Sequence, residues 1–150
     1  MISLRNATEA DSKLYFQWAN DPETRANSIN TSEIEWKDHL IWFNNKLNSP
    51  DSYLYLMEFN NQPIGQIRFE IENNDAIISF SIDPAYRGQH WGRKILALGI
   101  QVLHQTVKRK LNIIGKVKNN NIASIKAFEY NNFMLRQKEN DYCYFHFTKN

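Results

Sequence analysis

The stretch Ile82-Asp83-Pro84-Ala85-Tyr86-Arg87-Gly88-Gln89-His90-Trp91-Gly92-Arg93 decides how the rest of this sequence is interpreted. It predicts a strand that ends at a proline, a basic turn that contains glycine, and a long amphipathic helix. The first turn of a helix presents unpaired backbone N–H groups and a partial positive charge, which suit a phosphate or pyrophosphate. Gly88 and Gly92 would let a ligand approach the backbone closely. The alternative is a turn before a core helix that binds no ligand.

The composition sets the class of protein. With 150 residues, 42% hydrophobic and 13% aromatic content, we expect one globular domain over residues 1–150. A net charge of +2 gives no reason to expect a nucleic-acid partner. Cys143 is the only cysteine, so an internal disulfide and a cysteine metal cluster are excluded, and no metal site is expected. Because no apolar run is long enough to span a bilayer and no export segment opens the sequence, we expect a cytoplasmic protein with no membrane partner.

Hydrophobic spacing and turn residues predict elements in the order β-α-α-β-β-β-α-β-α-β-β. The strands are expected near residues 2–4, 53–59, 64–71, 76–82, 113–117, 133–138 and 142–148. The helices are expected between residues 8 and 20, from the capping box Ser32-x-x-Glu35 to Leu47, from about Gly92 to Lys110, and from Asn121 to about Asn131. A polar loop is expected through residues 25–28, after Asn20-Asp21-Pro22.

The turn before the long helix resembles motif A of the GCN5-related N-acetyltransferases, Arg/Gln-x-x-Gly-x-Gly/Ala, which holds the pyrophosphate of acetyl-CoA. Arg87 and Gly92 match its first and last positions, and His90 stands where the first glycine is expected. This is a departure from the motif, since glycine permits a positive φ, although histidine is one of the few other residues that adopt a positive φ more often than average. The resemblance implies acetyl-CoA as co-substrate, bound by Ser81, Ile82, Arg87, Gly88, Gln89, His90, Trp91, Gly92 and Arg93.

A second stretch, residues 121–133, resembles the family's motif B, Asn-x-x-Ala/Ser-x-x-x-Tyr-x-x-x-Gly-Phe. The resemblance implies that Asn121 contacts the pantetheine amides and that Ser124 lies near the cofactor. Asn132 replaces the motif glycine, and asparagine is the usual substitute at a left-handed helix end. Phe128, which the resemblance places among the cofactor-binding residues, stands where many relatives carry a tyrosine that protonates the departing CoA thiolate. Here the thiolate either leaves without full protonation or is protonated by a different acid. The candidates are Tyr130, Tyr142 and Tyr144, with Tyr130 preferred.

The order of elements resembles the same family along the whole chain. The resemblance implies an α/β (α+β) fold with a central, mixed, mostly antiparallel twisted sheet and helices on both faces. The strand that ends at Ile82 and the strand around Ile113 would splay apart, and the pantetheine arm would enter the resulting cleft.

Three further stretches, residues 18–28, 39–43 and 65–69, resemble the nucleotide-amino-sugar N-acetyltransferases of pseudaminic acid biosynthesis. These relatives acetylate the 4-amino group of a UDP-linked 4-amino-4,6-dideoxy sugar by direct attack of the amine on the thioester. The resemblance implies such a sugar nucleotide as the second substrate. The expected substrate-binding residues are Asn20, Arg25, Ser28, Trp42 and Arg68.

His39 and Glu70 are the candidate bases for the amine proton. The alternative for His39 is a hydrogen-bonded packing histidine, and the alternative for Arg68 and Glu70 is an internal ion pair. Two other functions stay open: acetylation of protein N-termini, and a degenerate CoA-binding interaction module. The sequence is compatible with a monomer or a homodimer.

Overall fold

The computed structural model describes residues 1–148 and centres on one seven-stranded sheet with the strand order β1-β2-β3-β4-β5-β7-β6. All neighbouring pairs are antiparallel except β4 and β5, which are parallel. This confirms the expected mixed, mostly antiparallel sheet. The strands are β1 (Ile2–Asn6), β2 (Ser52–Phe59), β3 (Gln62–Glu72), β4 (Asp75–Ile82), β5 (Asn112–Lys118), β6 (Met134–Lys138) and β7 (Tyr142–Thr148).

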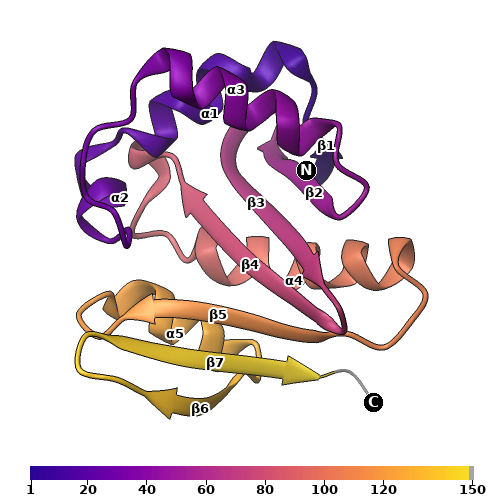
Figure 1. The fold of residues 1–150 in the computed structure, drawn as a ribbon, viewed down its shortest axis with the longest axis vertical. Coiled ribbons are helices and arrows are strands. Elements are labelled where there is room, and N and C mark those ends of the chain that lie inside the picture. The colour runs from indigo at the N-terminus through magenta and orange to yellow at the C-terminus, as the bar shows by residue number, and fades with distance from the viewer. Residues whose placement is uncertain (149–150) are drawn as a thin grey trace.

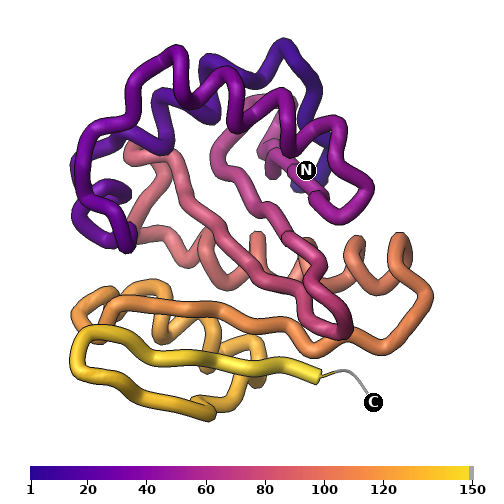
Figure 2. The backbone as a smooth tube through the Cα atoms, in the orientation of Figure 1, coloured from indigo at the N-terminus to yellow at the C-terminus, as the bar shows by residue number. Residues whose placement is uncertain are grey.

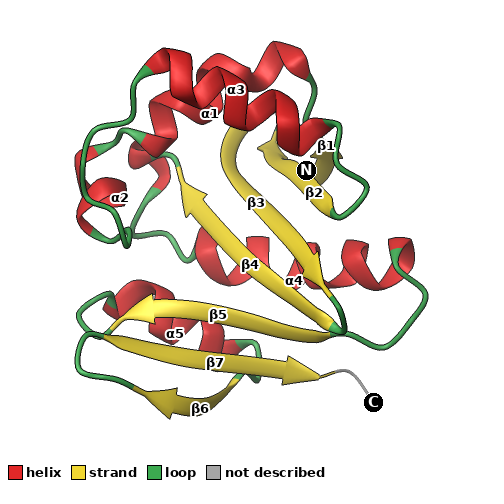
Figure 3. Cartoon of the chain, viewed as in Figure 1, coloured by secondary structure: helices red, strands yellow, loops and turns green. Residues whose placement is uncertain are grey.

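The helices cover both faces of the sheet, as expected (Figure 3). On one face, Leu54 and Leu56 of β2 pack against Tyr15, Trp18 and Phe43 of two helices. The larger hydrophobic cluster, on the other face, includes buried residues of both later helices, which pack against β3, β4 and β5. The helices are α1 (Ser12–Ala19), α2 (Pro22–Ala26), α3 (Trp36–Leu47), α4 (Trp91–Thr106) and α5 (Ile122–Tyr130), with 3-10 turns at Glu9–Asp11 and Pro84–Tyr86.

Strands β4 and β5 separate soon after they meet. Their pairing covers only residues 75–77 of β4 and residues 112–114 of β5, although both strands continue beyond it. Figure 1 shows them diverging from the turn beside α4 toward α2, and Figure 2 shows the same divergence in the backbone trace. This confirms that the two strands splay apart, as the family resemblance implied.

Asparagines form the tight turns between the first strands of the sheet. Asn60 and Asn61, with φ of 51° and 68°, connect β2 to β3, and Asn73, with φ of 57°, lies between β3 and β4. Asparagine tolerates positive φ, which matches the twist of a two-residue hairpin turn. These two turns join the three strands that were expected near residues 53–59, 64–71 and 76–82.

Two predicted helix boundaries are wrong. The long helix ends at Thr106, because Val107 is extended (φ −105°, ψ 109°), so the basic run of residues 108–110 lies beyond the helix. The third helix starts at Trp36 with Glu35 as its N-cap, so Ser32 does not form the predicted capping box.

A short helix, α2, forms where the sequence suggested only a polar loop. The side chain of Asp21 accepts a hydrogen bond from the Thr24 N–H at 3.1 Å, and Pro22 occupies the first helical position. Aspartate before proline is a strong helix start, because the carboxylate caps the helix and proline fixes φ. Within residues 1–148, no helix has both the length and the apolarity needed to cross a membrane.

Candidate active site

The N-terminus of α4 is built to receive an anion. His90 precedes the helix in the left-handed conformation (φ 65°, ψ 19°) and does not cap it with its side chain, and Gly88 has φ 78°. The N–H groups of the first helical turn have no acceptor within the helix, so they remain available to a phosphate. His90 thus adopts the positive φ that the motif glycine would permit. The Trp91 ring contacts Phe59 at 5.1 Å between centroids, and its Nε1 donates to Gln89 Oε1 at 3.3 Å.

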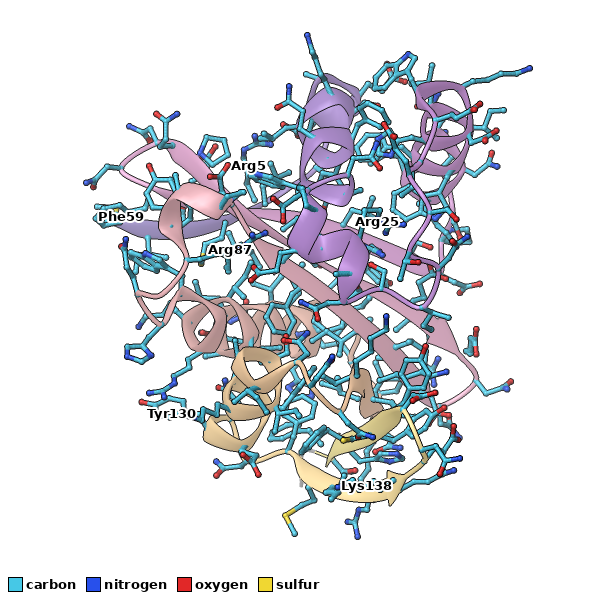
Figure 4. The ribbon with its side chains drawn as sticks, turned by 90° about the vertical axis from the view of Figure 1, so that its left-hand side faces the viewer. Arg5, Arg25, Phe59, Arg87, Tyr130 and Lys138 are labelled. Atoms are coloured by element: carbon cyan, nitrogen blue, oxygen red, sulfur yellow. The ribbon has the colours of Figure 1, made fainter. Side chains whose placement is uncertain are left out.

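Arg87 does not point its charge at this helix end. Its Nη2 donates to Asp21 Oδ2 at 2.7 Å, and its Nη1 lies 2.8 Å from Glu23 Oε2. Burial opposes ionisation of Asp21, yet the hydrogen bonds from Arg87 and Thr24 hold its pKa below the ordinary value. Figure 4 shows Arg87 between the turn that follows β4 and helix α2. The motif arginine therefore connects this turn to the helix before α3.

The open part of β4 carries small polar side chains on the face that α1 and α3 occupy. Gln66 of β3 pairs with Ser81 in the sheet register, and its Nε2 donates to Ser81 Oγ at 3.1 Å. The Ile82 carbonyl accepts a hydrogen bond from Arg87 Nε at 3.1 Å. Below, the gap is the space between the diverging parts of β4 and β5. Side chains of neighbouring residues thus hold the β4 side of this gap in place.

Motif B forms the start and end of α5. Asn121 caps the helix, since its Oδ1 accepts a hydrogen bond from the Ser124 N–H at 3.3 Å. Asn132, just after the helix, has φ 67°, which confirms its predicted left-handed conformation. Asn121 thus stabilises the start of α5, and Asn132 allows the chain to turn after its end.

Phe128 is a core residue. Only 2% of it is exposed, and its ring lies 5.6 Å from the Phe145 ring at an interplanar angle of 8°. Phe80 of β4 meets the ring edge-on at 5.7 Å. The Phe128 ring thus packs against β4 and β7 within the core.

Tyr130 and Arg93 lie together outside the core. Tyr130 is 65% exposed, and the Arg93 guanidinium lies 4.7 Å from its ring centre. Figure 4 shows Tyr130 at the outer edge of α5. The Tyr130 ring is thus paired with a cation on the surface.

Arg68 is a half-buried cation without a carboxylate partner within ion-pair distance among residues 1–148. Its guanidinium lies 5.0 Å from the centre of the Trp42 ring, and burial lowers its pKa. Glu70 pairs instead with Lys46, at 2.7 Å, so the internal Arg68–Glu70 ion pair does not form. In the register, Arg68 faces Ser79 at the start of the gap, whereas Glu70 faces Ile77 where β4 and β5 are still paired.

His39 packs between α1 and α3. It is 3% exposed, and its Nε2 donates to the Ser12 carbonyl at 2.9 Å, because a carbonyl can only accept. The rings of Phe16, Trp36, Trp42 and Phe43 surround it. Burial is the main cause that lowers its pKa. This geometry favours the packing interpretation over a role as the base.

Three of the expected substrate-binding residues hold the segment between α1 and α3. Asn20 makes two hydrogen bonds with the Ile34 backbone, at 2.7 and 2.8 Å. Arg25 donates to the carbonyls of Ala19, Asn30 and Ser32 and to the hydroxyl of Ser28. These polar groups form hydrogen bonds within the segment, so they stabilise its conformation.

Sequence reasoning missed the lysines of β5. Lys118 Nζ donates to the Ala26 carbonyl at the end of α2 at 2.7 Å, and Lys116 lies 4.4 Å from the Tyr142 ring centre. The signal was present, because Lys116 and Lys118 alternate with buried Gly115 and Val117 and so share the opposite face. Among residues 1–148, no three His, Cys, Asp or Glu side chains come together in a way that could hold a metal ion.

Comparison with known proteins agrees with this geometry. Residues 2–134 match the model of the acetyltransferase (GNAT) domain. A search of curated protein sequences found no match. Among solved structures, a domain from Methanocaldococcus jannaschii is 22% identical with a TM-score of 0.84, each chain being 99% covered.

Two of the similar structures are named acetyltransferases. The Campylobacter jejuni N-acetyltransferase PseH in complex with acetyl coenzyme A is 19% identical, with a TM-score of 0.78 and full coverage of both chains. The spermidine N-acetyltransferase of Vibrio cholerae, in complex with CoA and spermine, is 14% identical, with a TM-score of 0.87 and coverage of 98% of this chain and 95% of that one. With the domain match, these structures agree with the fold described above, including the parallel β4 and β5 that separate after three paired residues. The chain belongs to the GNAT acetyltransferase family and is an N-acetyltransferase that takes its acetyl group from acetyl-CoA.

Proposed function

We propose that the protein acetylates the 4-amino group of a UDP-linked 4-amino-4,6-dideoxy sugar. The observation that carries the proposal is Arg68, a half-buried guanidinium with no carboxylate partner among the described residues, stacked on Trp42. A cation in this position is costly unless an anion joins it, and arginine binds phosphate oxygens in a bidentate manner. A nucleotide diphosphate supplies that anion.

The charges around the gap support an anionic acceptor. Lys116 and Lys118 of β5 lie on the same face of their strand, across the gap from Ser79 and Ser81. Glu70 is paired with Lys46. A polyamine or another polycation would meet lysines here, whereas a sugar nucleotide would meet attractive charge. Trp42, already stacked with Arg68, offers an aromatic face to a uracil or sugar ring.

The chemistry is direct attack of the amine nitrogen on the thioester carbonyl, with the acceptor held beside the open part of β4. A nitrogen–carbon bond forms, the carbon–sulfur bond breaks, and CoA leaves as a thiolate. Phe128 gives no proton, but thiols have an ordinary pKa near 8.5, so a thiolate is an acceptable leaving group. Glu70 lies on the same face as Arg68, two residues away along β3. We propose that it removes the amine proton through water, with one of its oxygens remaining paired with Lys46.

The experiment that tests the proposal measures release of CoA thiol from acetyl-CoA with UDP-4-amino-4,6-dideoxy-N-acetyl-altrosamine. Parallel reactions contain a basic peptide with a free N-terminus, and spermidine. We expect rapid release with the sugar nucleotide alone, and loss of most of that rate in Glu70→Gln, with Glu129→Gln as an exposed control. Release with the peptide or the polyamine alone would overturn the assignment of the acceptor.

A further inference from the structure

Helix α2 is fastened to both strands that border the gap. Arg87, in the turn that follows β4, forms ion pairs with Asp21 and Glu23 at 2.7 and 2.8 Å. Lys118, the last residue of β5, donates to the Ala26 carbonyl at 2.7 Å. Because β4 and β5 are parallel, both contacts lie at the same, diverging end of the two strands. Helix α2 therefore bridges the open end of the gap on the face where α1 and α3 lie (Figure 1).

The guanidinium of Arg87 is fully engaged in this bridge. Its Nε donates to the Ile82 carbonyl at 3.1 Å, and its Nη2 reaches Thr24 Oγ1 at 3.3 Å in addition to Asp21. Only 28% of the side chain is exposed. All three nitrogens thus face β4 and α2, and the N–H groups of the α4 terminus are left to hold a pyrophosphate without this side chain.

The bridge and the fold of α2 depend on one carboxylate oxygen. Asp21 Oδ2 accepts the hydrogen bond from Arg87 and also the one from the Thr24 N–H that starts the helix. Losing the Arg87 contact therefore weakens the cap of α2 as well as its attachment to the turn. Helix α2 continues into the segment before α3, which Arg25 and Asn20 hold in place. The position of α2 therefore affects the position of this segment.

We propose that Arg87 and Lys118 are positioning residues for the acceptor, which fix α2 across the end of the gap, and that Arg87 is not a ligand of the cofactor pyrophosphate. The inference rests on acetyl transfer to an acceptor in this gap, as in the proposed function, and not on which amine is the acceptor. It follows that the turn before α4, which binds the acetyl donor, also fixes the position of α2, which the acceptor contacts.

The test compares Arg87→Ala, Asp21→Asn, the double variant and Lys118→Met with Arg136→Ala, an exposed arginine on β6. Isothermal titration with acetyl-CoA should give dissociation constants within about threefold of wild type for all of them. With the UDP-linked amino sugar, Arg87→Ala and Asp21→Asn should each raise the acceptor KM about tenfold with little change in kcat, and the double variant should not exceed either single one, as expected for residues in one contact. Lys118→Met should raise the acceptor KM by a smaller factor, and Arg136→Ala should leave it unchanged.

A second readout does not depend on the acceptor. Hydrogen exchange of the amides in residues 23–26 should become faster in Arg87→Ala and Lys118→Met, while exchange at residues 92–100 stays as in wild type. Unchanged exchange in α2 would overturn the proposal even if no amine tested is a substrate. Loss of acetyl-CoA affinity of tenfold or more in Arg87→Ala, with Asp21→Asn unaffected, would instead make Arg87 a cofactor ligand.

Discussion

The ring of Phe128 lies directly over Gly115 of β5, in the space that a side chain at residue 115 would occupy. The contact joins α5 to the strand that borders the gap. It explains why Phe128, at a position where relatives carry tyrosine, belongs to the core here: the ring is closed in by Phe145 on one side and by the β5 backbone on the other.

Replacement of Gly115 by alanine should therefore destabilise the fold. The new methyl group would overlap the Phe128 ring, and overpacking of this kind costs about 1–3 kcal/mol. The free energy of unfolding in urea measures the loss. Gly92→Ala is the matched control, because a Cβ there would lie 3.5 Å from Phe80, an ordinary contact. The loss should shrink when Phe128→Leu is combined with Gly115→Ala, and an equal loss in both backgrounds would contradict this account.

The left-handed conformation of His90 predicts how substitutions there behave. With φ at 65°, glycine fits without strain, whereas a β-branched residue costs about 1–3 kcal/mol. His90→Gly should bind CoA within about threefold of wild type, because the backbone N–H groups carry the contact. His90→Val should lose at least about tenfold in affinity, since the turn has to rearrange. Isothermal titration with CoA gives both values. A tenfold loss in His90→Gly would show that the imidazole itself binds the ligand.

The conformations of His90 and Asn132 were predictable because they are local properties of motifs. The same is true of the order of strands and helices, apart from α2, although its Asp21-Pro22 start is itself a local helix signal. The partners of the long polar side chains were not predictable. Arg87 meets Asp21 across 66 residues of sequence, and His39 meets Ser12 across 27. Such contacts depend on how α1, α2 and α3 pack on the sheet, which no local pattern specifies.

Arg68→Met should separate stability from function. Removing a half-buried cation that has no carboxylate partner among the described residues should leave the free energy of unfolding unchanged or raise it by about 1–2 kcal/mol. The acceptor KM should rise about 10- to 100-fold, because a charge-assisted contact to the substrate is lost. Urea unfolding and steady-state kinetics with the UDP-linked amino sugar measure the two effects. Arg136→Met, on the exposed strand β6, serves as the control. A stable variant with an unchanged KM would remove Arg68 from the substrate site.

The ion pair between Arg5 and Asp11 predicts how stability depends on acid. Two hydrogen bonds from Arg5, at 2.8 and 2.9 Å, hold the pKa of Asp11 below its ordinary value near 3.8. The stabilisation is therefore present above that value and is lost as the pH falls through the lower pKa of the folded state. Asp11→Asn should lose about 1–2 kcal/mol at pH 7, allowing for the partial exposure of Arg5.

The same variant should differ less from wild type in acid. In urea unfolding at pH 7, 4 and 3, the difference in free energy of unfolding between Asp11→Asn and wild type should become smaller as Asp11 becomes protonated. Glu129→Gln, on the exposed side of α5, should follow wild type throughout. A constant difference in free energy of unfolding from pH 7 to pH 3 would mean that the carboxylate charge contributes nothing to stability.

His39→Gln distinguishes a packing histidine from a base. A glutamine amide can keep the hydrogen bond that His39 Nε2 donates to the Ser12 carbonyl, but it cannot take up a proton. We expect kcat within about threefold of wild type, whereas loss of a general base typically costs about 10²- to 10⁴-fold. His39→Ala, which removes the hydrogen bond and leaves a cavity among four aromatic rings, should instead lose about 2–4 kcal/mol of stability. A large fall in kcat for His39→Gln, in a protein that unfolds at the wild-type urea concentration, would restore His39 as the base.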